Sequence, residues 1–262
     1  MKAGCLIIAP HPDDETIGAG IWMDRHRGQH ITVLHLTDGS PRDLANARAA
    51  GFHSRRAYAA ERRRELRKAL RLVGVSSSQF RVFSYVDKET YLNLPELCAR
   101  LASMIQALQP SVVLSPAYEG GHPDHDSAAF AVAAARRRVS SPFQHREFPL
   151  YHAGPGGAMV SGEFLPCPDA EVEICRLSDA EQEKKRSMLK SFTTQQEILN
   201  QFTVLHECFR DAQSYDFTSP PHEGTLLYEH WNLGVSSEQW LLHARQALGI
   251  GNGPEIAHGH LQ

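Results

Sequence analysis

Histidine and aspartate gather in two short segments of this 262-residue sequence, and both have the composition of a metal-binding corner. The first segment reads APHPDDE and contains His11, Asp13 and Asp14, whereas the second reads YEGGHPDHD and contains His122 and His125. Imidazole and carboxylate groups suit Zn²⁺ and similar divalent ions. The pair of segments therefore predicts a metal site with a further acidic group available as a base.

The spacing within the segments indicates which side chains could share one metal. Residues at i and i+3 near a helix start can face one centre, so His11 and Asp14 are expected to bind together. One histidine of the second segment would complete three protein ligands, the usual number in catalytic zinc sites, but spacing does not decide between His122 and His125. Asp13 would then be free to accept a proton from bound water. Alternatively, the acidic residues only complement the dipole of the helix that follows. This interpretation accounts for one such segment more easily than for two at equivalent positions.

The elements that must position these segments follow from hydrophobic periodicity. Apolar runs predict strands, and amphipathic runs bounded by Gly or Pro predict helices. The strands are expected at 5–9, 31–36, 80–85 and 112–114, and the helices at 13–27, 58–73, 95–109 and 127–138. This alternation predicts an α/β fold with a Rossmann-like open, mostly parallel sheet and helices on both faces. Carboxyl ends of parallel strands lie along one edge of such a sheet, so both segments should face one crevice.

The pattern changes after residue 148, where extra strands and helices are expected. PLYHAG and AEVEICRL predict strands, residues 179–192 and 195–206 predict helices, and residues 215–234 are mostly loop. We interpret residues 1–250 as a single domain and residues 251–262 as a disordered tail.

Composition limits the partners of the chain. The net charge of −3 and the absence of a recognition motif argue against nucleic acid, and no apolar run approaches the length of about 20 residues that spans a bilayer. Five scattered cysteines without C-x-x-C spacing favour free thiols and a cytoplasmic location. Residues 42–71 carry ten basic against three acidic residues. We favour a solvated helix face for that segment, and the alternative is a rim that attracts an anionic substrate.

The two segments, their order and their strand context resemble the LmbE-like zinc deacetylases, the superfamily that contains the PIG-L N-acetylglucosaminyl-phosphatidylinositol de-N-acetylases. Thr37-Asp38-Gly39 and Arg62-x-x-Glu65 between them also resemble family features. The resemblance covers residues 4–140 well and the remainder loosely. It implies that zinc is bound by His11, Asp14 and His125.

The resemblance also implies roles for neighbouring residues. Asp13 would be the general base, His122 a charged or proton-donating group beside the tetrahedral intermediate, and Asp124 a group that orients a histidine. Arg62 would contact substrate, and Tyr118 corresponds loosely to a tyrosine that holds the oxyanion in some relatives. Asp38, at another strand end, is a candidate to line the crevice.

The implied activity is hydrolysis of the acetamide of an N-acetylglucosamine-type substrate, which releases acetate and a free amino sugar conjugate. Two alternatives stay open: an amidase of the same superfamily that cleaves a larger acyl group from a sugar-thiol or antibiotic conjugate, and a non-catalytic sugar- or nucleotide-binding protein. Ligand type admits Fe²⁺ and Co²⁺ as well as Zn²⁺. Relatives of this kind lead us to expect a homo-oligomer.

Overall fold

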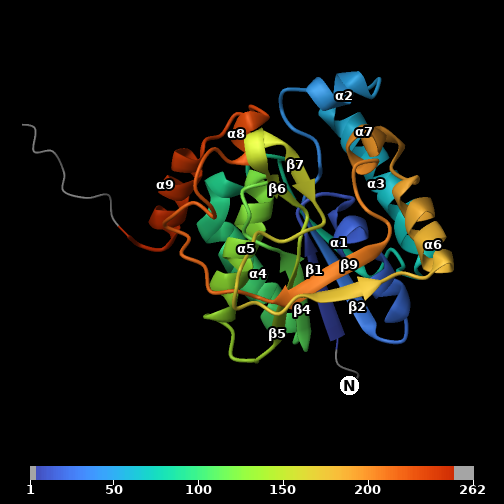
Figure 1. Ribbon diagram of the computed structural model, residues 1–262, viewed down its shortest axis with the longest axis horizontal. Helices are drawn as coiled ribbons and strands as arrows, with labels where there is room; N and C mark the ends of the chain where they lie inside the picture. The colour runs from blue at the N-terminus through green and yellow to red at the C-terminus, as the bar shows by residue number, and fades with distance from the viewer. Residues whose placement is uncertain (1–3, 251–262) are drawn as a thin grey trace, which may run out of the picture.

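The computed structural model describes residues 4–250, and its central feature is a seven-stranded sheet (Figure 1). The first five strands along the chain run parallel, and the last two join antiparallel at one side. In spatial order the strands are β3 (Phe80–Tyr85), β2 (His30–Thr37), β1 (Gly4–Ala9), β4 (Val112–Pro116), β5 (Gln144–Phe148), β9 (His206–Asp211) and β8 (Glu173–Arg176). This arrangement confirms the predicted open, mostly parallel α/β sheet.

Helices cover both faces of the sheet because side chains of a buried strand alternate between its faces. Leu6 and Ile8 of β1 pack in one core cluster, whereas Cys5 and Ile7 pack in the other. The first cluster includes residues of α4 (Leu94–Leu108), α5 (Pro123–Arg136) and α9 (Ser237–Ala247). The second includes residues of α1 (Asp14–Arg25), α3 (Arg55–Leu72) and α6 (Asp179–Leu189).

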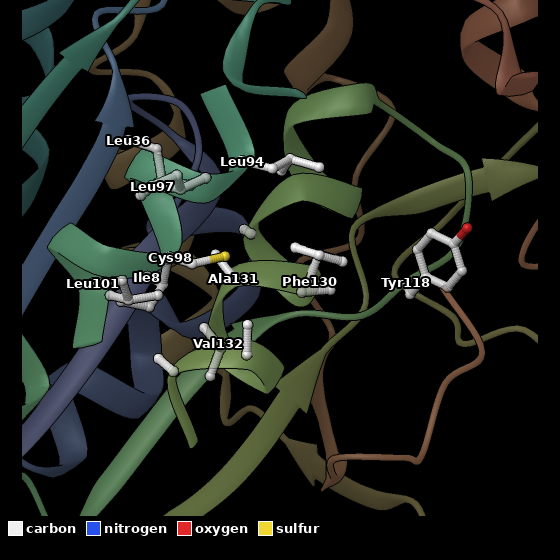
Figure 2. Close-up of a cluster of buried hydrophobic side chains, with 14 of the residues drawn as sticks. Ile8, Leu36, Leu94, Leu97, Cys98, Leu101, Tyr118, Phe130, Ala131 and Val132 are labelled. Carbon is white, nitrogen blue, oxygen red and sulfur yellow. The ribbon is translucent and has the colours of Figure 1, made fainter. Parts of the chain in front are cut away.

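Figure 2 shows the first cluster, in which α4 and α5 press their apolar faces together over the sheet. Leu97 and Leu101 of α4 lie across from Ala131 and Val132 of α5, and Ile8 of β1 lies beside Leu101. These side chains are essentially buried, so α4 and α5 are packed together against β1.

The strand order brings the two polar segments together. β1 pairs with β2 on one side and with β4 on the other, and Ile7 lies beside Leu114 in the β1–β4 register. Strand order reverses at this point, and ligands of open α/β sheets bind in the crevice at such a switch. The segments after β1 and β4 therefore emerge as neighbours.

A buried ion pair supports α1 from the C-terminal part of the chain. Glu207 of β9 accepts hydrogen bonds from the backbone N–H groups of Ile21 and Trp22, at 2.8 Å each. Lys185 of α6 donates to Glu207 at 2.5 Å and to the carbonyl of Ile17 at 2.6 Å. These side chains satisfy backbone groups that are freed where α1 departs from helical geometry at Ala19.

The prediction of a helix over 195–206 is wrong. Only α7 (Gln196–Leu199) is helical there, and the chain turns into β9 at His206. Residues 200–205 form turns instead, with Leu199 and Phe202 packed in the second core cluster, and they lead the chain into β9, whose Cys208 and Phe209 are buried in the sheet.

Several elements were not predicted from the sequence: β5, β9, α9 and the short α8 (Leu227–His230). The short α2 (Ala45–Ala49) lies within the basic segment of residues 42–71, and β6 (Tyr151–Ala153) pairs with β7 (Met159–Ser161) in a small separate sheet. The single-domain assignment stays a prediction, and the expected disordered tail lies outside the described residues. Within those residues, no helix combines the length and apolarity that crossing a membrane requires.

Candidate active site

The corner after β1 places an aspartate in a strained backbone conformation. Asp13 has φ 152°, a region that costs a non-glycine residue about 1–3 kcal/mol and persists only where the surroundings hold it. Its N–H donates to Glu15 at 3.1 Å. Glu15 is completely buried, and its same oxygen accepts from His35 Nε2 at 2.9 Å. Glu15 therefore fixes the backbone that carries Asp13.

Arg62 of α3 holds the same corner from its other side. Its guanidinium donates to the carbonyls of Gly39 and Pro12, at 2.8 and 3.0 Å, and to Asp13 Oδ2 at 2.7 Å. The side chain is only 4% exposed. Burial raises the pKa of Asp13 to about 8, against the lowering effect of Arg62. The guanidinium thus fixes the orientation of the Asp13 side chain.

The corner after β4 presents two histidines from the start of α5. His122 precedes the helix, and its Nδ1 accepts a hydrogen bond from the backbone N–H of Asp124 at 3.2 Å. A neutral imidazole that accepts at Nδ1 carries its proton on Nε2, so His122 presents a donor there. Burial and the neighbouring His11 lower the pKa of His122 to about 3.

Asp124 is a fully buried carboxylate with several donors. It accepts from the backbone N–H groups of Lys88 and Thr90, at 2.7 and 3.1 Å, and from the Thr90 hydroxyl at 2.5 Å. His11 Nε2 lies 3.1 Å from it. The histidine within hydrogen-bond distance of Asp124 is therefore one from the opposite corner.

The two corners meet at Asp14. One carboxylate oxygen of Asp14 lies 3.2 Å from His11 Nδ1, and the other lies 3.4 Å from His125 Nε2. The ring of His11 is 4.5 Å from that of His122 and 5.3 Å from that of His125, measured between centroids. Although burial opposes ionisation, His125 and His11 hold the pKa of Asp14 well below its usual range.

These residues can hold a divalent cation. His11, His122 and His125 each offer a ring nitrogen within 4.8 Å of the others, and a second such set joins His11 and His122 to Asp87 and Asp124. All are buried, and within residues 4–250 His125 Nε2 and Asp87 Oδ1 have charged neighbours but no partner with hydrogen-bond geometry. Buried polar atoms without partners are costly, and an ion between them would remove that cost. The donor set therefore fits a borderline-to-hard metal ion.

Asp87 and Tyr151 were missed by sequence reasoning. Asp87 Oδ1 lies 3.2 Å from His11 Nε2 and 3.7 Å from His122 Nε2. Asp87 comes two residues after β3. Ligands of an open α/β sheet bind at the carboxyl ends of its parallel strands, so the same search of strand ends would have found Asp87. The Tyr151 ring lies 5.0 Å from that of His125, but Tyr151 begins β6 in the small antiparallel sheet, a position for which the sequence offered no comparable signal.

A cavity of about 240 Å³ opens over the cluster. Its walls include seven of the polar residues already described together with apolar side chains from the C-terminal part. The seven polar residues are His11, Asp13, Asp14, Arg62, Asp87, His122 and Tyr151. The active-site cavity thus combines both corners with α3.

Two residues that were expected near the crevice do not line this cavity. The Tyr118 hydroxyl donates to the carbonyl of Ser219 at 2.9 Å, and its ring packs against Phe217 in the apolar cluster of Figure 2. Asp38 pairs with Arg55 at 2.8 Å. Both side chains are engaged in the fold, so the substrate roles expected for them gain no support from their position.

Known proteins match this chain in sequence and fold. A family model described as PIG-L, GlcNAc-PI de-N-acetylase, matches residues 6–136, which is half of the chain. A probable N-acetyl-alpha-D-glucosaminyl L-malate deacetylase 2 of Bacillus anthracis is 35% identical over 138 residues, or 50% of this chain and 58% of the relative. The diacetylchitobiose deacetylase of Thermococcus kodakarensis is 32% identical over 134 residues, or 48% of this chain and 46% of the relative.

A solved structure agrees over a longer range. The crystal structure of the A40926 pseudoaglycone deacetylase Dbv21 superposes with a TM-score of 0.64 and 19% identity, covering 82% of this chain and 99% of that chain. At this identity the likeness shows the fold alone. In sequence, the match to the first relative named above covers less than two thirds of that protein's length.

Proposed function

Because the chain belongs to the PIG-L family of GlcNAc-PI de-N-acetylases, we propose that it hydrolyses the acetamide group of an N-acetylglucosamine-type substrate. The products would be acetate and a free amino sugar conjugate. The observation that carries this proposal is Asp13, a strained aspartate that lines the same cavity as His11 and Asp14, with His125 Nε2 3.4 Å from Asp14. The deacetylase names of the relatives support the same reaction.

The proposal includes a divalent metal, with zinc as the first candidate. His11, Asp14 and His125 would hold it, as the family resemblance implies, and the distances of 3.2 and 3.4 Å from Asp14 to His11 Nδ1 and His125 Nε2 support this choice. When bound, such an ion lowers the pKa of water and polarises an amide carbonyl. The ligand types equally suit Fe²⁺ or Co²⁺.

Asp13 would act as the general base. It takes a proton from the attacking water as the water oxygen bonds to the acetamide carbon, and it returns that proton to the leaving nitrogen as the C–N bond breaks. Arg62 and Glu15 fix the position of Asp13, which is what proton transfer over hydrogen-bond distance requires. General acid–base catalysis of this kind contributes about 10²- to 10⁴-fold.

His122 would stabilise the developing negative charge on the carbonyl oxygen. Its Nδ1 is occupied by the backbone N–H of Asp124, so its Nε2–H is the donor available to the cavity. A fixed donor in a buried site stabilises an oxyanion without reorganisation. Tyr151, which also lines the cavity, is the tyrosine best situated to assist, in place of Tyr118.

Acetate release from a panel of N-acetylglucosamine conjugates by zinc-loaded protein tests the proposal. Wild type should release acetate, Asp13→Asn should lose at least about 100-fold in kcat while it retains metal, and the surface variant Asp169→Asn should match wild type. Turnover retained by Asp13→Asn would remove Asp13 from the role. Release of a longer acid from N-acyl conjugates without acetate would favour the amidase, and ligand binding without turnover would favour a binding protein. The homo-oligomeric state and cytoplasmic location stay predictions.

A further inference from the structure

A second recess adjoins the active-site cavity, and we call it the lateral groove. Its volume is about 650 Å³, and its walls come from residues 46–61, residues 193–201 and Trp231. It shares four wall residues with the active-site cavity, namely Asn46, Gln195, Ile198 and Trp231. The two recesses are therefore adjacent, so a molecule with its acetamide at the metal cluster could extend toward the groove.

The lateral groove is a built feature of the fold. Glu65 of α3 is buried and accepts hydrogen bonds from the Thr193 hydroxyl, the Thr194 N–H and the Thr194 hydroxyl, at 2.5, 2.9 and 2.7 Å. Gln195 then donates to the Tyr58 hydroxyl at 2.7 Å. Glu65 lies three positions after Arg62, so one face of α3 anchors both the catalytic corner and the groove wall.

The groove walls have the chemistry of a carbohydrate site. Aromatic rings, side-chain amides and hydroxyl groups dominate them, and these are Phe52, Tyr58, Trp231, Asn46, Gln195, Gln196, Gln201, Thr193 and Thr194. A pyranose ring offers a C–H face to an aromatic ring and hydroxyl groups to amides, which bind by donating and accepting.

The charge in the groove is acidic. Glu61 and Glu197 line it, and the described residues of its walls include neither lysine nor arginine. Three arginines of the basic segment have acidic partners: Arg42 pairs with Glu89, Arg55 with Asp38, and Arg64 with Glu61 of the groove wall. The basic rim that would attract an anionic substrate is therefore not what faces this groove.

We propose that the lateral groove binds the group attached to the amino sugar, and that this group is an uncharged sugar or polyol. The inference rests on the proposed deacetylase function, because that function places the acetamide in the adjoining cavity. A carboxylate or phosphate on the attached group would meet the Glu197 carboxylate, and no lysine or arginine among the described residues lines the groove to compensate that repulsion.

Kinetics with three probes test the inference in the zinc-loaded enzyme. N,N′-diacetylchitobiose, free N-acetylglucosamine and an N-acetylglucosaminyl malate conjugate supply a neutral group, no group and an anionic group. We expect kcat/KM for chitobiose to exceed that for free N-acetylglucosamine by about tenfold, the change produced by about 1.4 kcal/mol. The malate conjugate should be no better than free N-acetylglucosamine. A malate conjugate that equals or exceeds chitobiose would overturn the inference and leave the deacetylase intact.

A charge reversal in the groove gives a second readout. Glu197 is exposed and lines only the lateral groove, so Glu197→Lys should fold and should raise the malate-to-chitobiose ratio of kcat/KM by about threefold to fivefold. Glu238→Lys, an equally exposed reversal that lines neither recess, should leave the ratio unchanged. An identical ratio in Glu197→Lys and wild type would contradict the acidic groove as the cause of selectivity.

Binding without turnover separates the two proposals. Calorimetry with the Asp13→Asn protein should show chitobiose binding that Phe52→Ala weakens, since Phe52 lines only the groove. Such binding together with no acetate release by wild type would refute the deacetylase and uphold the groove as a neutral-sugar site. Acetate release by wild type with no difference between Phe52→Ala and its parent would uphold the deacetylase and refute the groove.

Discussion

Replacement of Arg62 by lysine separates a positioning role from the substrate contact expected from the family resemblance. Arg62 directs three hydrogen bonds at Gly39, Pro12 and Asp13, and a single lysine ammonium on a shorter stem cannot reach all three. Loss of two hydrogen bonds that involve a charged group, each worth about 1.5–3 kcal/mol, would lower the free energy of unfolding by about 3–6 kcal/mol.

The expected activity change follows from the strain at Asp13. Without its guanidinium partner the φ of 152° is held by fewer contacts, so the carboxylate should shift, and a displacement of about 1 Å can cost about 100-fold in rate. We therefore expect Arg62→Lys to lower kcat by about 100-fold, to change KM little, and to lower the Tm by at least about 6 °C.

The assay combines steady-state acetate release with thermal unfolding, and Arg64→Lys is the matched control. Arg64 lies on the same helix, but its side chain is 65% exposed and pairs with Glu61 at the surface. It should therefore change stability by less than about 1 kcal/mol. A rise in KM of more than about tenfold in Arg62→Lys, with kcat and Tm at wild-type values, would refute positioning and establish substrate contact instead.

Three further perturbations follow from the structure. Lys185→Met should destabilise the fold by about 3–5 kcal/mol in denaturant titrations, because it leaves Glu207 buried without its cation. The control Lys184→Met removes a half-exposed lysine and should cost less than about 1 kcal/mol. Equal losses of stability in the two variants would contradict this reasoning. Gly121→Ala should lower the free energy of unfolding by about 3 kcal/mol or more, since its Cβ would lie 1.9 Å from a backbone oxygen of β6. The control Gly28→Ala should keep a Tm close to wild type, because its Cβ would have no described atom within 4 Å. Chelation should lower the Tm, and added zinc should restore it. At a hundredfold excess over its Kd, zinc should raise the free energy of unfolding by about 2.7 kcal/mol. A Tm that responds to neither treatment would argue against metal binding.

Most of the parallel sheet was predictable because its signals are local. Buried parallel strands appear as short apolar runs, and the turns between them carry Gly and Pro. The C-terminal part was less predictable because its strands acquire their role only by pairing. Residues 195–206 have a helical pattern, yet residues from His206 onward complete the sheet beside β5. Competition between local pattern and long-range pairing is invisible in a single sequence.

For the candidate site, the sequence by itself determined the chemistry. The types and spacing of His11, Asp14, His122 and His125 specified imidazole and carboxylate ligands at two strand ends, and strand alternation specified that these ends share one edge. The tertiary structure decided which partners those groups meet. It brought Asp87 to His11. It also buried Arg62 against Asp13. Hydrogen bonds of a buried side chain depend on distances across the folded chain, and no spacing within one segment encodes them.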